Sequence, residues 1–341
     1  MEFKKICVEY IWIDAFDNTR SKLRVLEFEK TCKELKLPIW NFDGSSCGMA
    51  TGTDSDVILK PVAYYSNPFI TWCESYLVLC ETYNKDGVTP HETNYRKKCV
   101  DTYIQSIDSK PLFGIEQEYL IISRSGIPYK WNTPEEPGVG PQGPYYCGVG
   151  GDRSFGRTIS NKHLEYCLKA GIKICGTNAE VMASQWEYQI GPVNPIEVSD
   201  QLWLSRYILT RVCEEYDCTV TFHPKPYKGD YNGSGGHTNF STELMRNKDG
   251  IEHIKSACEK LSLTHPAHMA VYGNFNEMRL TGLHETSSIH DFSWGISDRG
   301  RSIRIPLNVS VDGCGYLEDR RPAANLNPYL VTEILMRTIC L

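Results

Sequence analysis

The secondary-structure pattern of this chain changes at one place, the turn-forming segment 86–90, and this change limits what the chain can fold into. Before the segment, runs rich in β-branched and aromatic residues predict strands at 8–14 and 75–79. After it, strand and helix patterns alternate. The chain has 341 residues, more than twice the roughly 150 that a single domain commonly holds. We therefore predict two domains, residues 1–88 and residues 89–341, the second a larger α+β unit.

The second domain should contain three clear strands and three clear helices. The strand patterns cover residues 114–122, 183–190 and 237–241. Serine commonly caps helix N-termini, so we predict one helix from Ser160 to Gly171 and another from Ser199 to Cys213. Residues 134–151 form a long Pro/Gly-rich loop in this interpretation. Apolar residues at helical spacing predict a third helix through Ile251, Ile254, Cys258 and Leu261.

The composition excludes some classes of partner. The chain has 36 Lys and Arg against 42 Asp and Glu, a net charge of −6, whereas nucleic-acid binders usually carry a basic surface. No apolar run approaches the roughly 18 residues of a membrane span, and no apolar block near Met1 resembles a signal peptide. The 14 cysteines include no C-x-x-C pair, which favours reduced thiols over a zinc or redox motif. We expect a cytoplasmic protein with no nucleic-acid or membrane partner.

A pair of glutamates on a predicted strand is the first sign of chemistry. Glu116 and Glu118 are two residues apart, so both carboxylates leave the same face of the strand. A solvated edge strand would tolerate this arrangement. However, Ile115 and residues 119–122 make the strand look buried, and buried like charges need a cation between them.

Three further residues extend this acidic set. Glu180 and Glu187 lie among apolar neighbours on apparent strands, and His237 follows two glycines. Any one of them alone is more simply structural. Together, a set dominated by carboxylates suits Mg²⁺ or Mn²⁺ better than zinc.

Arginines form the complementary feature in this net-acidic chain. Six of them fall close together: Arg279, Arg299, Arg301, Arg304, Arg320 and Arg321. A set of surface ion pairs with Glu285, Glu318, Asp298 and Asp319 is the simpler explanation, and we adopt it for Arg301 and Arg321. Metals combined with arginines are, however, typical of phosphoryl transfer, where charge stabilisation supplies most of the catalysis. The substrate should therefore carry both phosphate and carboxylate.

The common phosphate-binding loops are missing from the sequence. It contains no G-x-x-x-x-G-K-[ST] motif and no complete G-x-G-x-x-G motif. The Gly-rich segment 229–236 could bring backbone close to a ligand, although this signal is weak on its own.

Taken in order, the motifs resemble the glutamine synthetase family of the eukaryotic type (class II) along nearly the whole chain. The matching segments are WNFDGSS at 40–46, GIEQEY at 114–119, GPQGPYYCGVG at 140–150, GTNAEV at 176–181, QWE at 185–187, GHTNFS at 236–241, RLTG at 279–282, HET at 284–286, SIRIP at 302–306 and GYLEDRRP at 315–322. The resemblance implies a small N-terminal β-grasp domain followed by a larger catalytic domain.

The resemblance also implies a reaction and its metals. ATP, glutamate and ammonia would give glutamine through a γ-glutamyl phosphate, with two or three Mg²⁺ or Mn²⁺ ions in each site. One ion would be held by Glu118, Glu180 and Glu187. The other, next to the phosphates, would be held by Glu116, His237 and Glu318.

Substrate contacts follow from the same resemblance. Glutamate would be bound by Arg279, Arg299, Arg320 and the backbone around Tyr231, Asn232 and Gly233. ATP would be bound by Trp131, Glu187, Asn239, Ser241, Arg304 and Tyr316. For catalysis, Arg299 and Arg304 would contact the transferring phosphate, Glu285 would be the flap residue over the intermediate, and Asp43 would take a proton from ammonium.

In the family, this aspartate enters the site from a neighbouring subunit's N-terminal domain, within a decamer of two stacked pentamers. The family usually has an extension ahead of the strand near Cys7 and a longer C-terminus, and both contribute to subunit contacts. The resemblance therefore implies a homo-oligomer, a decamer of two pentamers with intersubunit active sites, but supports this assembly less directly than it supports the active site.

Four residues depart from the family's motifs without removing an assigned metal ligand or catalytic residue: Tyr231, Met278, Leu307 and Leu317. Two rival functions remain open. A relative that ligates glutamate to another amine would have no use for Asp43 as an ammonium site. A non-catalytic relative would typically have lost metal ligands or arginines, all of which are present here.

Overall fold

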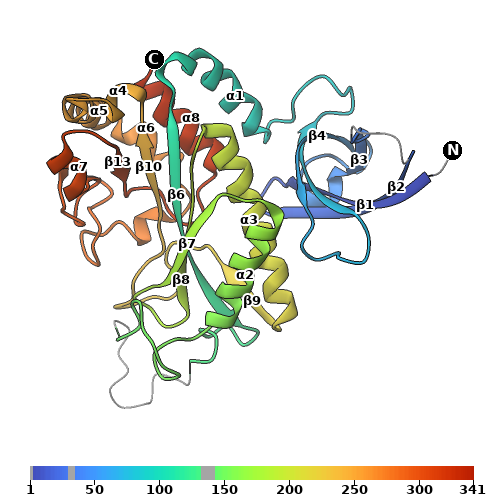
Figure 1. Cartoon of the computed structure of the whole chain (residues 1–341), viewed down its shortest axis with the longest axis horizontal. Helices are drawn as coiled ribbons and strands as arrows, with labels where there is room; N and C mark the ends of the chain where they lie inside the picture. Colours follow the sequence, from blue (N-terminus) through green and yellow to red (C-terminus); the bar gives the residue numbers. More distant parts are fainter. Residues whose placement is uncertain (1–2, 30–34, 132–142) are drawn as a thin grey trace.

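Two separate β-sheets organise the chain, one on each side of the segment 84–94. The computed structural model describes residues 3–29, 35–131 and 143–341 (Figure 1). Strands β1 to β5 form a sheet in the N-terminal lobe, and strands β6 to β13 form a second sheet in a larger lobe. The larger lobe also holds all the α-helices of the described residues. This arrangement confirms the predicted α+β class.

The N-terminal sheet has the strand order β2-β1-β5-β4-β3, with β1 and β5 parallel and the other pairs antiparallel. Its strands are β1 Phe3–Ile13, β2 Thr19–Glu29, β3 Trp40–Asp43, β4 Asp56–Ser66 and β5 Ser75–Tyr83. Buried apolar residues of β1, β4 and β5 form a core of their own around Val8, Tyr10 and Leu59. The edge strand β3 ends at Asp43, and a short 3₁₀ turn, Gly44–Cys47, follows it.

The larger sheet has the order β11-β12-β13-β10-β6-β8-β7, and β9 also pairs with β6. Its strands are β6 Leu112–Ser123, β7 Ile174–Ala179, β8 Gln185–Val193, β9 Cys218–Thr221, β10 Gly236–Ser241, β11 Trp294–Ile296, β12 Ile303–Ile305 and β13 Leu317–Asp319. The strand β6 is therefore central, because three other strands pair with it.

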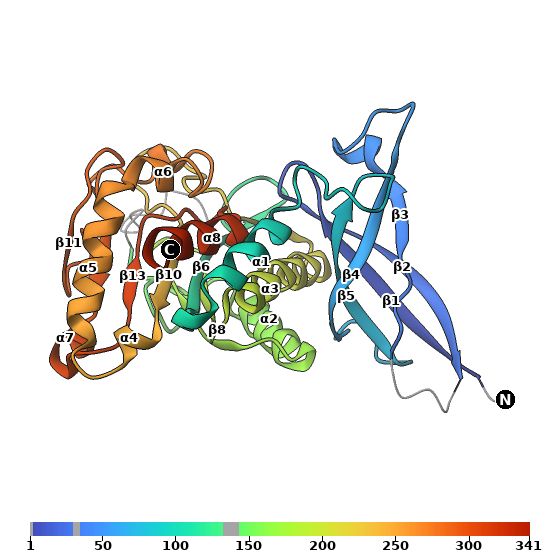
Figure 2. The ribbon, with the colours of Figure 1, turned by 90° about the horizontal axis from the view of Figure 1, so that it is seen from above.

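Helices pack against one side of this sheet (Figure 2). The helices are α1 Tyr95–Gln105, α2 Arg157–Ala170, α3 Pro195–Glu215, α4 Glu243–Arg246, α5 Gly250–Leu263, α6 His265–Met269, α7 Leu307–Asp312 and α8 Pro328–Ile339. Helix α3 contacts β6 and β8, α2 contacts β7, and α1 and α8 pack on α3. Consequently Gln117 of β6 faces buried Arg206 of α3, and its neighbours Glu116 and Glu118 face the opposite side.

The predicted strands, the apolar-stripe helix and the helix end at Gly171 are confirmed, but both predicted N-terminal caps are wrong. Helix α2 begins at Arg157 after Gly156, and Ser160 lies inside it with its hydroxyl bonded to Thr177. Helix α3 begins at Pro195, because the side chain of Asn194 accepts hydrogen bonds from the first backbone N–H groups of the helix. Ser199 lies in the second turn of α3 and donates to the carbonyl of Pro195.

Three further expectations can be compared with the structure. Every cysteine among the described residues is a free thiol, as expected. Across residues 3–29, 35–131 and 143–341, no helix is long and apolar enough to cross a membrane. The part of the predicted Pro/Gly loop from 134 to 142 lies outside the described residues, and residues 144–147 form a turn.

Candidate active site

Cross-strand pairs bring four of the predicted metal ligands together on one face of the larger sheet. Glu116 on β6 lies directly opposite His237 on β10. Glu118, two residues further along β6, lies directly opposite Glu187 on β8. Side chains directly opposite each other on one face of a sheet start about 5 Å apart at their Cβ atoms, so these four groups converge.

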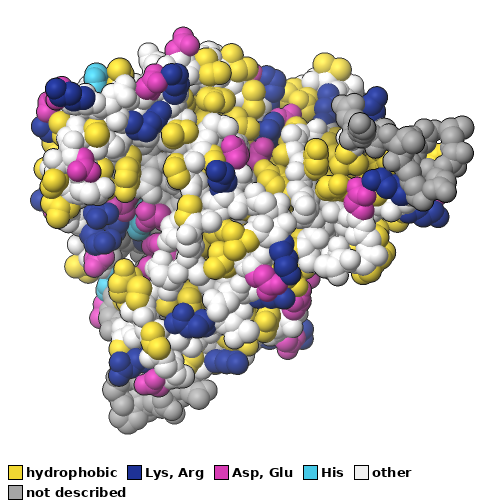
Figure 3. Space-filling view, in the orientation of Figure 1, with side chains coloured by type: hydrophobic (Ala, Val, Ile, Leu, Met, Phe, Trp, Pro, Cys, Tyr) yellow, Lys and Arg dark blue, Asp and Glu magenta, His cyan; other side chains and the backbone are white. Residues whose placement is uncertain are grey.

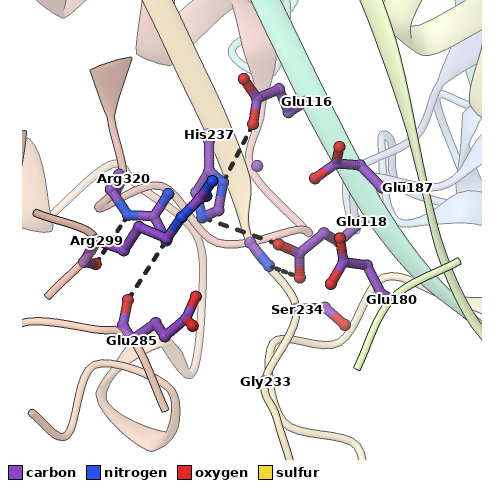
Figure 4. A network of polar contacts seen from close by, with 12 residues as sticks. Glu116, Glu118, Glu180, Glu187, Gly233, Ser234, His237, Glu285, Arg299 and Arg320 are labelled. Atoms are coloured by element: carbon purple, nitrogen blue, oxygen red, sulfur yellow. Dashed lines mark hydrogen bonds and ion pairs between the residues drawn. The ribbon is translucent and has the colours of Figure 1, made fainter. Parts of the chain in front are cut away.

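These side chains line a cavity of about 640 Å³. Glu318 from β13 and Glu180, directly after β7, complete its acidic wall. Arginines from the C-terminal third of the chain approach from the other side, as Figure 4 shows for Arg299 and Arg320. In the space-filling view, acidic side chains and a histidine gather in a hollow next to basic side chains (Figure 3).

Two groups of side chains in this cavity lie close enough together to hold a metal ion. Ligand atoms of Glu116, His237 and Glu318 lie within 4.8 Å of one another, and so do those of Glu118, Glu187 and His237. His237 faces both groups, because its Nδ1 is 3.5 Å from a Glu116 oxygen while its Nε2 is 3.9 Å from a Glu118 oxygen. The first group is the set predicted from the sequence. In the second, His237 stands where Glu180 was expected.

The protonation behaviour of these residues fits a divalent cation. Burial, together with the positive charge of Arg320, lowers the pKa of His237 far below its usual value, which leaves the neutral imidazole that binds metals. Burial and mutual repulsion raise the pKa values of Glu118, Glu180 and Glu187. A cation among these carboxylates would remove the repulsion, and oxygen-rich ligand sets suit Mg²⁺ or Mn²⁺.

Glu318 is the point where acidic and basic groups of the cavity meet. Its Oε1 accepts a hydrogen bond from Nη1 of Arg320 at 2.6 Å, and its Oε2 accepts one from Nη1 of Arg304 at 2.6 Å. Arg320 also donates from Nε to the carbonyl of Arg299 and from Nη2 to the carbonyl of Glu285. Arg304, predicted to bind phosphate, and Arg320, predicted to bind glutamate, therefore share one buried carboxylate.

Arg279 lines the cavity but is largely occupied with holding the backbone. Its Nη2 donates to the carbonyls of Arg320, Arg321 and Pro322 at 3.0, 2.9 and 2.8 Å, and the residue is 5% exposed. The Gly-rich segment packs directly on it, since a Cβ at Gly233 would lie 2.5 Å from Arg279 Cγ. This close approach explains why glycine is needed there.

The two predicted surface ion pairs behave differently. Arg301 pairs with Asp298 at 2.7 Å, and both side chains are exposed as expected. Arg321 pairs with Asp319 at 2.7 Å, but both side chains are fully buried, so the surface interpretation was wrong for this pair. The reason is the alternation of β13, which turns Glu318 toward the cavity and Asp319 toward Tyr272 in the core.

A second cavity of about 380 Å³ adjoins the first. It is lined by three of the residues assigned to ATP, Asn239, Ser241 and Tyr316, and by apolar residues such as Leu112 and Ile190. Glu116 belongs to the walls of both cavities, so the two spaces meet at a predicted metal ligand. The other residues assigned to ATP, Glu187 and Arg304, line the first cavity.

Trp131 and Tyr231 are not brought to either cavity. Among the described residues they pack against each other, with ring centroids 6.3 Å apart, in a small cluster that includes Tyr145 and Ala183. Asn232 and Gly233, which follow Tyr231 in the Gly-rich segment, do line the first cavity.

Asp43 and Glu285 lie in different parts of the molecule. Asp43 is exposed at the end of β3 and accepts hydrogen bonds from Ser45 and Ser46, which lower its pKa and keep it ionised. It is not among the residues that line the cavity of its own chain. Glu285 does line it, where consecutive left-handed residues, His284 at φ 54° and Glu285 at φ 59°, fold the segment sharply at the cavity wall.

Sequence reasoning missed several polar residues of the site. Gln185, Asn178 and Gln189 donate hydrogen bonds to the carboxylates of Glu118, Glu180 and Glu187, respectively. Arg246 lines the second cavity and donates to Ser241. A signal existed for the two glutamines, because each is two residues from Glu187 and so shares its face of β8. The sequence offers no such signal for Arg246.

Comparison with known proteins is consistent with this geometry. Residues 4–85 match the family model described as glutamine synthetase, beta-Grasp domain, and residues 94–339 match the one described as glutamine synthetase, catalytic domain. A protein named glutamine synthetase from Tuber borchii is 52% identical over 335 residues, which cover 98% of this chain and 92% of the relative. Proteins of the same name from Panulirus argus and Saccharomyces cerevisiae are 52% and 49% identical, covering 97% and 98% of this chain and 92% and 90% of the relatives.

Proposed function

The chain belongs to the glutamine synthetase family and catalyses the ATP-dependent ligation of glutamate and ammonia to glutamine, and from this premise we propose how its two cavities share the reaction. The larger cavity takes glutamate, the divalent cations and the γ-phosphate of ATP. The smaller cavity takes the rest of the nucleotide. The shared wall at Glu116 supports this division, because it puts the nucleotide next to the metal ligands.

Two or three Mg²⁺ or Mn²⁺ ions belong to the larger cavity in this proposal. One ion would be held by Glu118, Glu180 and Glu187, and the other by Glu116, His237 and Glu318. When bound, the ions neutralise phosphate charge and polarise the phosphoryl group that is transferred. The buried carboxylates and the neutral imidazole of His237 support the assignment.

The arginines bring two anionic substrates together. We assign Arg279 and Arg320 to the carboxylates of glutamate and Arg299 and Arg304 to the transferring phosphate, next to the backbone of Asn232 and Gly233. The γ-carboxylate of glutamate attacks the γ-phosphorus of ATP, and ADP leaves. This step converts a poor electrophile into an acyl phosphate, and the arginines offset the negative charge that accumulates as the substrates approach.

Ammonia must then replace the phosphate before water does. We assign Asp43 as the carboxylate that attracts ammonium and takes its proton, so that neutral ammonia attacks the acyl carbon and inorganic phosphate leaves. Glu285 and its sharply folded segment would cover the intermediate and exclude water. The ionised state of Asp43 and the place of Glu285 on the cavity wall support these roles.

Asp43 requires a partner subunit in this scheme. It is exposed on the N-terminal lobe, away from the cavity wall of its own chain, which supports an active site completed by a neighbouring copy. We therefore propose a homo-oligomer, a decamer of two pentamers, in the cytoplasm. The free thiols are in keeping with that reducing compartment.

One observation carries these assignments: six predicted ligands and four predicted arginines line a single cavity although they are far apart in the sequence. The test is phosphate release from Mg-ATP, with glutamate and ammonium each added and omitted. We expect release that requires glutamate and is strongly stimulated by ammonium, with one glutamine formed per phosphate. Asp43→Asn should keep slow, ammonium-independent phosphate release and lose glutamine formation.

Other outcomes would identify the alternatives. Stronger stimulation by another amine than by ammonium would keep the fold and the metals but change the second substrate. No release with any combination, from a correctly assembled oligomer, would indicate a non-catalytic protein. Equal loss of phosphate release and glutamine formation in Asp43→Asn would contradict the role given to Asp43.

A further inference from the structure

Two amide side chains link carboxylates of the metal cavity to each other. Gln189 on β8 donates from Nε2 to Glu187 Oε1 at 2.5 Å and to Asn178 Oδ1 at 3.0 Å. Asn178 on β7 donates in turn from Nδ2 to Glu180 Oε1 at 3.0 Å. A continuous hydrogen-bonded chain, which we call the amide bridge, therefore runs from Glu187 through Gln189 and Asn178 to Glu180.

The amide bridge has only one workable orientation. A carboxylate without its proton can only accept hydrogen bonds, whereas an amide has a donor end and an acceptor end. Gln189 must therefore present Nε2 to Glu187, and its remaining N–H reaches the oxygen of Asn178. That leaves the N–H groups of Asn178 to face Glu180. Each carboxylate consequently has one defined oxygen, Oε1, held by an amide donor.

The backbone is built to accommodate this bridge. In the antiparallel pairing of β7 and β8, Asn178 lies opposite Glu187 and Gly176 lies opposite Gln189. A Cβ at Gly176 would lie only 3.1 Å from Gln189 Oε1. The missing side chain at this position leaves the space in which the Gln189 amide lies across β7.

We propose that Asn178 and Gln189 are positioning residues that hold Glu180 and Glu187 for a divalent cation. The proposal rests on the metal site of the proposed function and extends it to residues that do not ligate the metal. Hydrogen bonds to ligating carboxylates fix their orientation, and losing such partners usually weakens metal binding about tenfold to hundredfold. Fixed orientations are needed here because Glu180 and Glu187 lie in the wall of one cavity, where two like charges repel each other.

The test uses substitutions that keep the shape of each side chain but remove its hydrogen bonds, Asn178→Leu and Gln189→Met. Asn178 is the more informative position, because it lines only the larger cavity, whereas Gln189 lines both. The matched control is Gln201→Met. Gln201 is also a buried glutamine, 3% exposed, but its partners are Lys173 and Glu197, outside the cavity.

The main readout is binding of Mn²⁺ to metal-stripped protein, followed by electron paramagnetic resonance. We expect Asn178→Leu and Gln189→Met each to bind Mn²⁺ about tenfold to hundredfold more weakly, and Gln201→Met to bind it as the wild type does. Glutamate-dependent phosphate release by Asn178→Leu should return to the wild-type rate when Mn²⁺ is raised by the same factor. Its KM for ATP at saturating Mn²⁺ should not change.

A double-mutant cycle distinguishes coupling through the amide bridge from two independent effects of the substitutions on Mn²⁺ binding. Because both amides act through one chain, Asn178→Leu combined with Gln189→Met should weaken Mn²⁺ binding no more than the stronger single substitution does. Fully additive losses, or wild-type Mn²⁺ affinity in Asn178→Leu, would overturn the proposal. Asn178→Ala serves the same comparison if the leucine variant does not fold, because alanine also removes the hydrogen bonds. Failure of the wild type to bind Mn²⁺ would instead overturn the metal site itself.

Discussion

Arg320 shows how one residue serves several partners at once in this site. Its three nitrogens reach Glu318 and the carbonyls of Arg299 and Glu285, so the planar guanidinium fixes a carboxylate and two backbone segments together. A lysine would supply the charge but not this fork. Arg320 therefore fixes the geometry of the cavity wall as well as supplying a positive charge.

The first prediction concerns this residue. Arg320→Lys should raise the KM for glutamate about tenfold to hundredfold, since hydrogen bonds to charged groups contribute about 1.5–3 kcal/mol each. Steady-state kinetics at saturating ATP and ammonium would measure the change. Arg301→Lys is the control, because Arg301 pairs with Asp298 at the surface. A similar KM in both variants would argue against a glutamate contact at Arg320.

A second prediction at this scale concerns pH. Burial and repulsion raise the pKa of Glu118 and Glu187 to about 8 and that of Glu180 to about 7. Below about pH 6.5 the unfolded chain also binds extra protons, at His163, His237 and His268, whose pKa values burial lowers in the folded state. Above that pH the carboxylates dominate and the metal-free folded protein binds more protons than the unfolded chain, so its melting temperature should fall as the pH rises from about 7 to about 8. Saturating Mg²⁺ should make the melting temperature depend less on pH, because the ions replace the protons on these carboxylates. Identical profiles with and without Mg²⁺, measured by calorimetry, would contradict the prediction.

The clustering of the candidate metal ligands could be predicted from the sequence, and their hydrogen-bonding partners could not. Glu116 and Glu118 could be recognised because buried like charges on one strand face have few explanations other than a cation. Asn178 and Gln189 carry no charge, and amides are common on any strand face. Their role appears only when the pairing of β7 with β8 is known.

At the scale of single elements, the helix starts show where local sequence rules compete. Asn194 and Ser199 are both capping residue types, and the asparagine has the stronger position because Pro195 follows it at the first turn of α3. The proline fixes its own φ and needs no N–H partner there. The predicted helix therefore had the correct interior but the wrong start.

The third prediction follows from this competition. Asn194→Ala should destabilise the protein by about 1 kcal/mol, because the N–H groups of Ile196 and Glu197 lose their acceptor. Chemical denaturation followed by far-ultraviolet circular dichroism would measure the loss. Ser199→Ala provides the comparison, because Ser199 bonds to the carbonyl of Pro195 within the helix and lies 3.3 Å from Thr332 Oγ1, so it holds no N–H group of the helix start and should matter less. A larger effect at Ser199 would contradict this ranking of the two positions.

On the scale of the whole molecule, buried ion pairs join the two sheets. Arg96 of α1 donates to both oxygens of Asp200 in α3, at 2.9 and 3.0 Å, and to Glu81 of β5 at 2.9 Å. Glu9 of β1 also accepts a hydrogen bond from Tyr207 of α3. The N-terminal sheet is therefore tied to helix α3, which packs on the strands β6 and β8 that carry candidate metal ligands.

The fourth prediction tests that connection. Arg96→Met should destabilise the protein by about 3–5 kcal/mol, because it leaves two buried carboxylates without a counter-charge. Lys97→Met in the same helix should change stability by less than about 1 kcal/mol, since Lys97 forms an exposed pair with Asp101. Urea denaturation of both variants gives the comparison. Equal losses would mean that the buried network does not hold the two lobes together.

The fifth prediction concerns the shared active site. Oligomers made only of Asp43→Asn subunits, or only of Glu318→Ala subunits, should be inactive for glutamine synthesis. Oligomers assembled from equal amounts of the two should regain about a quarter of wild-type activity. The reason is that one interface in four combines an intact Asp43 from one subunit with an intact Glu318 from its neighbour. Mixing Glu318→Ala with Glu116→Gln subunits is the control, because both changes lie in one cavity. Oligomers that mix Asp43→Asn with Glu318→Ala and stay inactive would contradict an intersubunit site.

The order of the strands in the larger sheet has a consequence for how the molecule is made. A ribosome releases the chain N-terminus first, and all five strands of the N-terminal sheet are complete by Tyr83. The metal cavity needs β6 and β8 but also β13, which is the last strand in the described chain and carries Glu318. A nascent chain therefore holds most of the clustered carboxylates long before the arginines that face them. A ribosome that stopped before residue 317 would leave the strands of a whole N-terminal sheet, and the group of Glu116 and His237 would lack Glu318.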